Sequence, residues 1–97
     1  MKLKIIKEKI NNDMLHLSLI GEMTVYSAVN LKSILLKELD RCSGITMNLA
    51  EISEADTSGF QLLLFLKREA EMLGKSFRIT EVSPRLKSIF TLYREMI

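Results

Sequence analysis

The sequence predicts an α/β fold in which the elements follow the order strand-strand-helix-strand-helix-strand-helix. Short segments with alternating apolar and polar residues indicate the strands, and longer segments with apolar residues three or four positions apart indicate the helices. The first two strands form an antiparallel hairpin, whereas strands joined through helices run parallel. Every strand also carries polar residues on its second face, which a sheet covered on both faces lacks. We therefore expect a four-stranded mixed sheet with the helices on one face.

The first two strands span residues 3–10 and 14–20. Asn and Asp tolerate left-handed backbone conformations, so the run from Asn11 to Asp13 predicts the turn between them. The neighbouring pair Ile5-Ile6 interrupts the alternation of the first strand, as a β-bulge does.

The first helix follows a loop over residues 21–24 and ends near Arg41. Either Thr24 or Ser27 is suited to cap its start. Its buried stripe consists of Ala28, Leu31, Leu35 and Leu39. The third strand spans residues 45–49, and residues 51–56 form a connection to a second helix over residues 58–73.

The fourth strand spans residues 77–80, where Phe77 and Ile79 alternate with polar residues. Ser83-Pro84 predicts the start of the third helix, because serine caps a helix and proline suits its first position. The buried face of this helix consists of Leu86, Ile89, Phe90 and Tyr93.

Composition predicts one globular domain over residues 1–97. The hydrophobic share is 47%, the charged share is 27%, and the net charge of +2 does not favour nucleic-acid binding. The single cysteine, Cys42, excludes an internal disulfide, suits a reducing cytoplasm and is interpreted as structural. No apolar run reaches membrane-spanning length, so we expect a cytoplasmic protein without membrane insertion.

The tetrapeptide Asp56-Thr57-Ser58-Gly59 lies where the third strand gives way to the second helix. The first turn of a helix has unpaired N–H groups and the positive end of the dipole, which favours an anion. The hypothesis is a phosphorylation switch that a partner protein reads. Two alternatives stay open: a hydroxyl of Thr57 or Ser58 only caps the helix, or Asp56 only accepts backbone hydrogen bonds in a turn.

The second helix has more apolar residues than one buried stripe needs. Leu64 projects almost opposite the stripe, with Phe60 on one side and Phe65 on the other. Either neighbouring helices shield the two phenylalanines, or the side chains form an apolar patch that docks a partner beside the tetrapeptide. The exposure of Leu64 distinguishes these two interpretations.

The residues do not favour an enzyme. The one histidine, His16, has no metal-binding neighbours at ligand spacing, and Ser58 has no evident base to activate it. Acids near the tetrapeptide, such as Glu51 and Glu54, are interpreted as solvated. We expect no catalytic residue, no metal and no cofactor.

Two motifs carry a resemblance to a known family. Asp56-Thr57-Ser58-Gly59 before an apolar helix resembles the Asp-Ser-Ser/Thr-Gly signature of STAS domains, the sulfate-transporter and anti-sigma-factor-antagonist family. The run from Leu19 to Met23 resembles the strand-ending Gly-Glu-Leu of that family. Thr24 stands where family members have aspartate, and Thr57 stands where many have serine.

The resemblance implies a regulatory domain that a serine-kinase anti-sigma factor, or a related GHKL-type kinase, phosphorylates and a PP2C-type phosphatase resets. It places the phosphoacceptor at Thr57, with Ser58 as the alternative. Glu22 is either a partner-binding acid or a solvated loop end. The full predicted partner-binding set is Glu22, Thr24, Asp56, Gly59, Phe60 and Leu64. The sequence is also similar to STAS subunits that bind the ATPase of phospholipid ABC transporters, and to STAS proteins of chemotaxis-type signalling.

Overall fold

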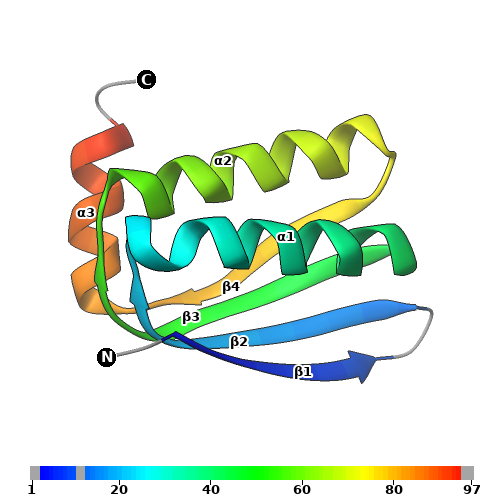
Figure 1. The fold of residues 1–97 in the computed structure, drawn as a ribbon, viewed down its shortest axis with the longest axis horizontal. Coiled ribbons are helices and arrows are strands. Elements are labelled where there is room, and N and C mark those ends of the chain that lie inside the picture. The colour runs from blue at the N-terminus through cyan, green and yellow to red at the C-terminus, as the bar shows by residue number, and fades with distance from the viewer. Residues whose placement is uncertain (1–2, 11–12, 95–97) are drawn as a thin grey trace.

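The structure is a computed structural model that describes residues 3–10 and 13–94, and it shows a sheet and helices in the predicted order (Figure 1). The strands are β1 (Lys4–Ile10), β2 (Met14–Met23), β3 (Gly44–Ala55) and β4 (Ser76–Val82). The helices are α1 (Val25–Arg41), α2 (Thr57–Met72) and α3 (Pro84–Arg94). The predicted element order is confirmed.

The four strands form one mixed sheet in the order β1-β2-β3-β4. β1 pairs antiparallel with β2, and β3 pairs parallel with both β2 and β4. A hairpin can join only antiparallel neighbours directly, and the parallel pairs are joined through α1 and α2. The predicted fold class is therefore confirmed.

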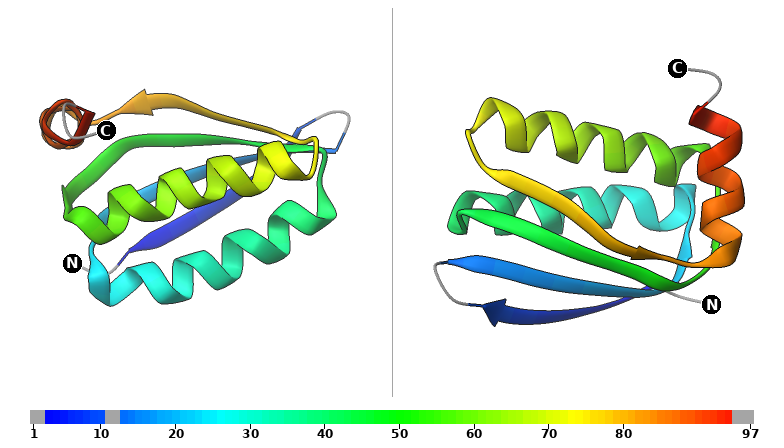
Figure 2. Two further views of the ribbon diagram at one scale, coloured as in Figure 1. Left: turned by 90° about the horizontal axis from the view of Figure 1, so that it is seen from above. Right: turned by 180° about the vertical axis from the view of Figure 1, so that it is seen from behind.

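One face of the sheet is covered by α1 and α2, which lie side by side (Figures 1 and 2). The core between them contains Leu17 and Leu19 of β2, Met47 of β3, Leu35 of α1 and Leu66 of α2, all almost fully buried. α3 stands across the end of the sheet and packs on β3 (Figure 2). Its Leu86 is fully buried, Ile89 and Phe90 are half-buried, and the side chain of Tyr93 lies outside the described residues.

β3 extends six residues beyond the predicted range, so the predicted connection over residues 51–56 is wrong. The reason is two irregularities in its pairing with β2, one near Leu49 and one near Ser53. At the irregularity near Leu49, the Asn48 side chain accepts a hydrogen bond from the Ala50 N–H at 2.8 Å. A β-bulge leaves an extra residue without a partner in the neighbouring strand, and the side chain takes the place of that partner here. Each shift turns the strand so that Leu49, Ile52 and Ala55 are all buried although they lie three apart. This spacing hides the strand from a search for alternation.

β2 also continues through the predicted loop at residues 21–23. Gly21 has a φ of 118°, a conformation that glycine adopts without steric cost, and Met23 beyond it is almost fully buried. Thr24 then caps α1, and its N–H donates to the Ser27 hydroxyl at 3.1 Å. Both candidate residues for the cap therefore take part in it.

The β1–β2 pairing runs without a shift from Lys4 to Ile10, so the bulge expected at Ile5-Ile6 is wrong. Ile5 packs against the core while Ile6 is exposed on the opposite face. The predicted turn at Asn11-Asn12 lies outside the described residues, and Asp13 next to it has the expected left-handed φ of 61°.

Candidate functional site

Asp56 joins the starts of the two helices that cover the sheet. One carboxylate oxygen accepts the N–H groups of Ser58 at 2.9 Å and Gly59 at 3.3 Å, which caps α2. The other oxygen accepts the N–H of Val25, the first residue of α1, at 3.0 Å. Backbone N–H groups at a helix start lack intrahelical acceptors, so this carboxylate satisfies three such donors. The interpretation of Asp56 as a structural acceptor therefore holds.

Gly59 lets the first turn of α2 lie directly on the end of β2. A Cβ atom at this position would lie 2.5 Å from the carbonyl oxygen of Met23, far inside van der Waals contact. The same oxygen accepts the Asp56 N–H at 3.3 Å. Glycine is therefore needed here for close packing of backbone on backbone, and the residue is buried.

The two hydroxyl residues of the tetrapeptide differ in their surroundings. Thr57, the first residue of α2, is exposed, and Ser58 is half-buried beside α1. The alternative that one of these hydroxyls is the helix cap is wrong, because the Asp56 side chain performs that role. A group added to Thr57 would therefore leave the cap in place.

Phe60 and Leu64, the apolar part of the predicted patch, are both half-buried. The ring of Phe60 meets the ring of Phe90 from α3 edge to face, with centroids 5.5 Å apart. Lys32 of α1 lies over the ring of Phe65, 4.3 Å from its centroid. Neighbouring helices thus cover much of both phenylalanines, as the shielding interpretation expects.

The most exposed apolar residues beside the tetrapeptide lie on α1, which the sequence analysis did not identify. Tyr26 is 94% exposed, Val29 is 75% exposed and Val25 is 52% exposed. The hydrogen bond from Val25 to Asp56 places this turn against the start of α2. The sequence does carry a signal for their exposure, because all three apolar residues fall outside the buried stripe of α1. We call Val25, Tyr26 and Val29 the α1 patch.

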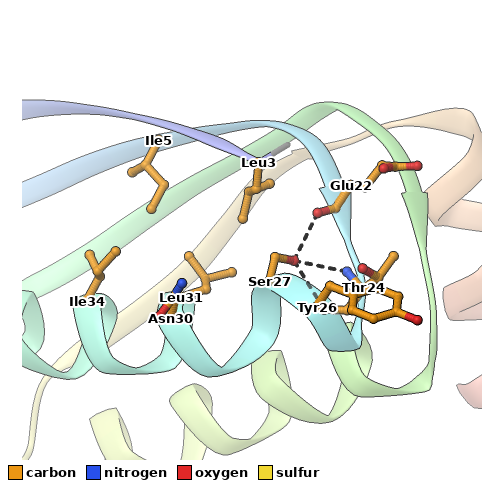
Figure 3. Close-up of a pocket in the computed structure, with 9 residues that line it drawn as sticks. All are labelled: Leu3, Ile5, Glu22, Thr24, Tyr26, Ser27, Asn30, Leu31 and Ile34. Atoms are coloured by element: carbon orange, nitrogen blue, oxygen red, sulfur yellow. Dashed lines mark hydrogen bonds between the residues drawn. The ribbon is translucent and has the colours of Figure 1, made fainter. Parts of the chain in front are cut away.

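Glu22 and Thr24 lie at the end of β2, where they line a groove of about 610 Å³ between β1 and α1 (Figure 3). Leu3 and Ile5 form one wall of this groove and Ile34 of α1 lies opposite them (Figure 3). The Ser27 hydroxyl donates to the backbone oxygen of Glu22 at 3.0 Å, which orders this corner. The two residues therefore share this groove with Tyr26 of the α1 patch (Figure 3).

Two acidic side chains lie at the end of the sheet beside the site. Glu22 lies opposite Glu54 in the β2–β3 register, and Glu54 pairs with Arg85 of α3 at 3.0 Å. The hydrogen bond from Arg85 lowers the pKa of Glu54 below its ordinary value. Within residues 3–10 and 13–94, no three His, Cys, Asp or Glu side chains gather in a way that would hold a metal ion. The His16 ring instead hydrogen-bonds to Thr46 at 2.7 Å on the open face of the sheet.

Comparison with known proteins places this geometry in context. A family model described as Mlab, STAS domain, matches residues 6–94. No curated protein matches the sequence. None of the helices in the described part of the chain has the length and apolar character needed to cross a membrane.

Solved structures of anti-sigma factor antagonists are among those that share the fold, at low sequence identity. Unphosphorylated SpoIIAA, an anti-sigma factor antagonist, has a TM-score of 0.79 at 19% identity, covering 94% of this chain and 81% of that chain. Phosphorylated Bacillus SpoIIAA has a TM-score of 0.75 at 20% identity, covering 93% and 83%. An anti-sigma factor antagonist from Mycobacterium paratuberculosis has a TM-score of 0.81 at 14% identity, covering 97% and 80%.

Proposed function

The chain belongs to the STAS domain family, and we propose that it is a non-enzymatic regulatory module whose binding to a partner is switched by phosphorylation of Thr57. The observation that carries the proposal is the exposure of Thr57 at the first position of α2, next to the exposed α1 patch. The Asp56 side chain caps the helix, so a group added to Thr57 leaves that cap in place. Ser58 is the alternative acceptor.

Phosphorylation would change the charge of this corner without breaking it. A phosphoryl group adds about −1.5 to −2 charge and three acceptor oxygens. On exposed Thr57 it reaches solvent at the positive end of the α2 dipole, which lowers its cost to the fold. The Asp56 carboxylate beside it is engaged with three backbone N–H groups and adds to the negative charge. A partner seated on the apolar residues of α1 would then face a concentrated negative charge.

Solved structures that share this fold support the proposed partner class. SpoIIAA, which shares this fold, has been solved in unphosphorylated and phosphorylated forms. The proposed partner is a serine-kinase anti-sigma factor or a related GHKL-type kinase in the cytoplasm, with a PP2C-type phosphatase as the resetting enzyme. The unphosphorylated module binds the kinase, and the phosphorylated module releases it. Glu22, Thr24, Asp56, Phe60 and Leu64 remain the proposed surroundings of the contact, whereas Gly59, predicted to bind the partner, is buried against Met23 and does not reach it.

The proposal is tested with a GHKL-type kinase encoded beside this gene, Mg-ATP and intact-mass analysis. The wild type should gain one phosphoryl group, Thr57→Ala should gain none, and Thr91→Ala, which removes an exposed threonine of α3, should behave as the wild type. Phosphate on Thr57→Ala but not on Ser58→Ala would move the acceptor to Ser58. No phosphate on the wild type would overturn the switch.

A second candidate function is a constitutive assembly subunit, and the family model favours it because its description names Mlab. In this role the module binds the ATPase of a phospholipid ABC transporter, or a chemotaxis-type protein, without a phosphate cycle. Copurification of the tagged chain with such a protein, at equal yield from wild type and Thr57→Ala, supports this role. Strongly reduced copurification of Thr57→Glu supports contact at the same corner in either role.

A further inference from the structure

β4 is an edge strand of the sheet in the described part of the chain. It pairs with β3 on one side, and in the view from above no other element lies outside it (Figure 2). Along the free side of an edge strand, backbone N–H and C=O groups point away from the sheet and are not used by a neighbouring strand. Such an edge takes up another strand unless its side chains prevent the approach.

A bulge at Thr80 decides which side chains of β4 share a face. In the β3–β4 register, Arg78 lies opposite Thr46 and Glu81 lies opposite Asn48, and these two β3 residues are two positions apart. Since alternate residues of a strand share a face, Arg78 and Glu81 both project from the open face of the sheet. Thr80 is the extra residue, and its hydroxyl donates to a β3 carbonyl oxygen at 3.3 Å.

The other face of β4, which lies toward the helices, carries apolar residues. Phe77, Ile79 and Val82 lie opposite three buried residues of β3. Phe77 and Val82 are only half-buried, and Ile79 is 36% exposed. The chain itself therefore leaves apolar surface accessible along this edge.

We propose that the β4 edge binds the β4 edge of a second copy of this chain in antiparallel orientation, so that the two sheets join into one. A two-fold axis perpendicular to the sheet and through the bulge brings Arg78 of each copy opposite Glu81 of the other. On the helix-bearing face, the same axis brings Phe77 opposite Val82 of the second copy. The pairs are complementary, with opposite charges on one face and apolar side chains on the other.

The charges on the two edges of the sheet favour β4 over β1 for this contact. Lys4 and Lys7 are exposed on β1, and lysine on an edge strand protects it against pairing because like charges meet. Arg78 and Glu81 are exposed on β4, and neither belongs to the ion pairs found within residues 3–10 and 13–94. Both charges are thus available to a second copy. The contact is short and bulged, so we expect a dimer that dissociates readily.

The dimer would leave the proposed switch accessible. The start of α2, with Thr57, lies at the end of the sheet where β4 finishes (Figure 1). In an antiparallel pair of β4 strands these ends point in opposite directions, so one dimer presents two separate switch corners. Two linked corners raise the avidity for a partner that is itself paired. Dimer formation does not require phosphorylation, so it stands apart from the proposed function.

Sedimentation equilibrium at low ionic strength tests the dimer, over protein concentrations from about 1 μM to 1 mM. Arg78→Glu places acids opposite acids, and Glu81→Arg places bases opposite bases, so each variant alone should dissociate at least about tenfold more readily than wild type. An equimolar mixture of the two variants restores opposite charges in both pairs, so its dissociation constant should return to within about threefold of the wild-type value. Lys4→Glu, a charge reversal on the β1 edge, is the matched control and should change nothing.

A wild type that stays monomeric throughout this range would overturn the β4 dimer, and so would a mixture that dissociates as readily as each variant alone. An equal loss with Lys4→Glu would also overturn it, because the effect would then be one of net charge. Amide hydrogen exchange gives an independent measurement, since β4 amides should exchange more slowly as the protein concentration rises. The substituted side chains are exposed, so the variants should fold, and circular dichroism checks this. Failure of the kinase assay overturns the proposed function and leaves these measurements unaffected.

Discussion

The Asp56 carboxylate accepts a hydrogen bond from the backbone N–H of Val25 at 3.0 Å, so the start of α2 is fastened to the start of α1 across the end of the sheet. Asp56 and Val25 are 31 positions apart in the chain. The same side chain caps α2. One carboxylate therefore fixes the relative position of the exposed α1 patch and the exposed Thr57, which are the two parts of the proposed switch.

Replacing Asp56 should destabilise the fold, and alanine should cost more than asparagine. Asp56→Ala removes an N-cap and leaves backbone donors without acceptors, so we expect a loss of about 1–3 kcal/mol in the free energy of unfolding. Asp56→Asn keeps a good cap but has a single acceptor oxygen, so it should lose the Val25 bond and show an intermediate value. Urea unfolding measures both, and equal stability of Asp56→Ala and wild type would contradict the hydrogen bonds described.

A methyl group at Gly59 should separate α2 from β2. Gly59→Ala places a Cβ 2.5 Å from the Met23 carbonyl oxygen, and a backbone atom cannot move aside as a flexible side chain does. We expect a loss of about 1–3 kcal/mol, typical of overpacking, although alanine favours helices. Lys67→Ala, at an exposed position of the same helix, is the control and should stay within about 0.5 kcal/mol of wild type. A stabilised Gly59→Ala would show that the close approach is not real.

The edge-to-face contact of Phe60 with Phe90 should couple α2 to α3. A double-mutant cycle with Phe60→Leu and Phe90→Leu should give a coupling free energy of about 0.5–1.5 kcal/mol, since leucine keeps apolar volume but lacks the ring edge. Thermal and urea unfolding supply the four stabilities. Strictly additive values would mean that the rings do not interact.

Cys42 should react slowly with alkylating agents at neutral pH. Burial raises the pKa of its thiol above the ordinary value of 9.0, so little thiolate is present. Iodoacetamide should therefore modify the folded chain more slowly than the chain unfolded in urea, with a midpoint above pH 9.0. A midpoint below that value would contradict the burial.

The same shift predicts a dependence of stability on pH. The Cys42 thiol holds its proton more tightly in the folded state than in the unfolded state. The contribution of this thiol to the free energy of unfolding is therefore fully present below the ordinary thiol pKa. The contribution is lost as the pH rises through the higher pKa of the folded state. Cys42→Ser should remove this part of the alkaline decline, which urea unfolding between pH 8 and 10 measures against wild type.

Tyr26 should matter for binding and little for folding. Its side chain is 94% exposed, so Tyr26→Ala should change the free energy of unfolding by less than about 0.5 kcal/mol. An aromatic residue at the centre of an interface contributes about 2 kcal/mol or more, so partner affinity should fall more than tenfold. Met72→Ala is the matched control, because Met72 is 79% exposed at the far end of α2. Equal losses by calorimetry for both variants would remove the α1 patch from the interface.

Local signals predicted the architecture well because each is carried by neighbouring residues. Three of these signals appear in the structure as expected. They are the alternation in β2, the apolar stripe of α1 with Leu31 and Leu35, and the start of α3 at Ser83-Pro84. The Ser83 hydroxyl accepts the Leu86 N–H at 3.1 Å, as a cap should. These features depend on a few positions in sequence, so they can be found without knowledge of the fold.

Features that depend on two distant segments were not predictable in the same way. The extension of β3 rests on bulges whose existence is decided by the partner strand β2. The dual role of Asp56 depends on where α1 begins, and the covering of Phe60 depends on Phe90 arriving from α3. The exposure of Tyr26 and Val29 was readable as a departure from the α1 stripe, but its importance appears only when α2 is placed beside it.

The order of the strands in the sheet has a consequence for how the protein is made. Because β1, β2, β3 and β4 occupy the sheet in the order in which they are synthesised, each strand emerging from the ribosome finds its neighbour already in place. Parallel pairing is slow when it must wait for remote segments, and here each step needs only the preceding strand and one helix. α3, which follows β4 in the chain, then meets the ring of Phe60 at the start of α2, so this contact forms only after all four strands have been made.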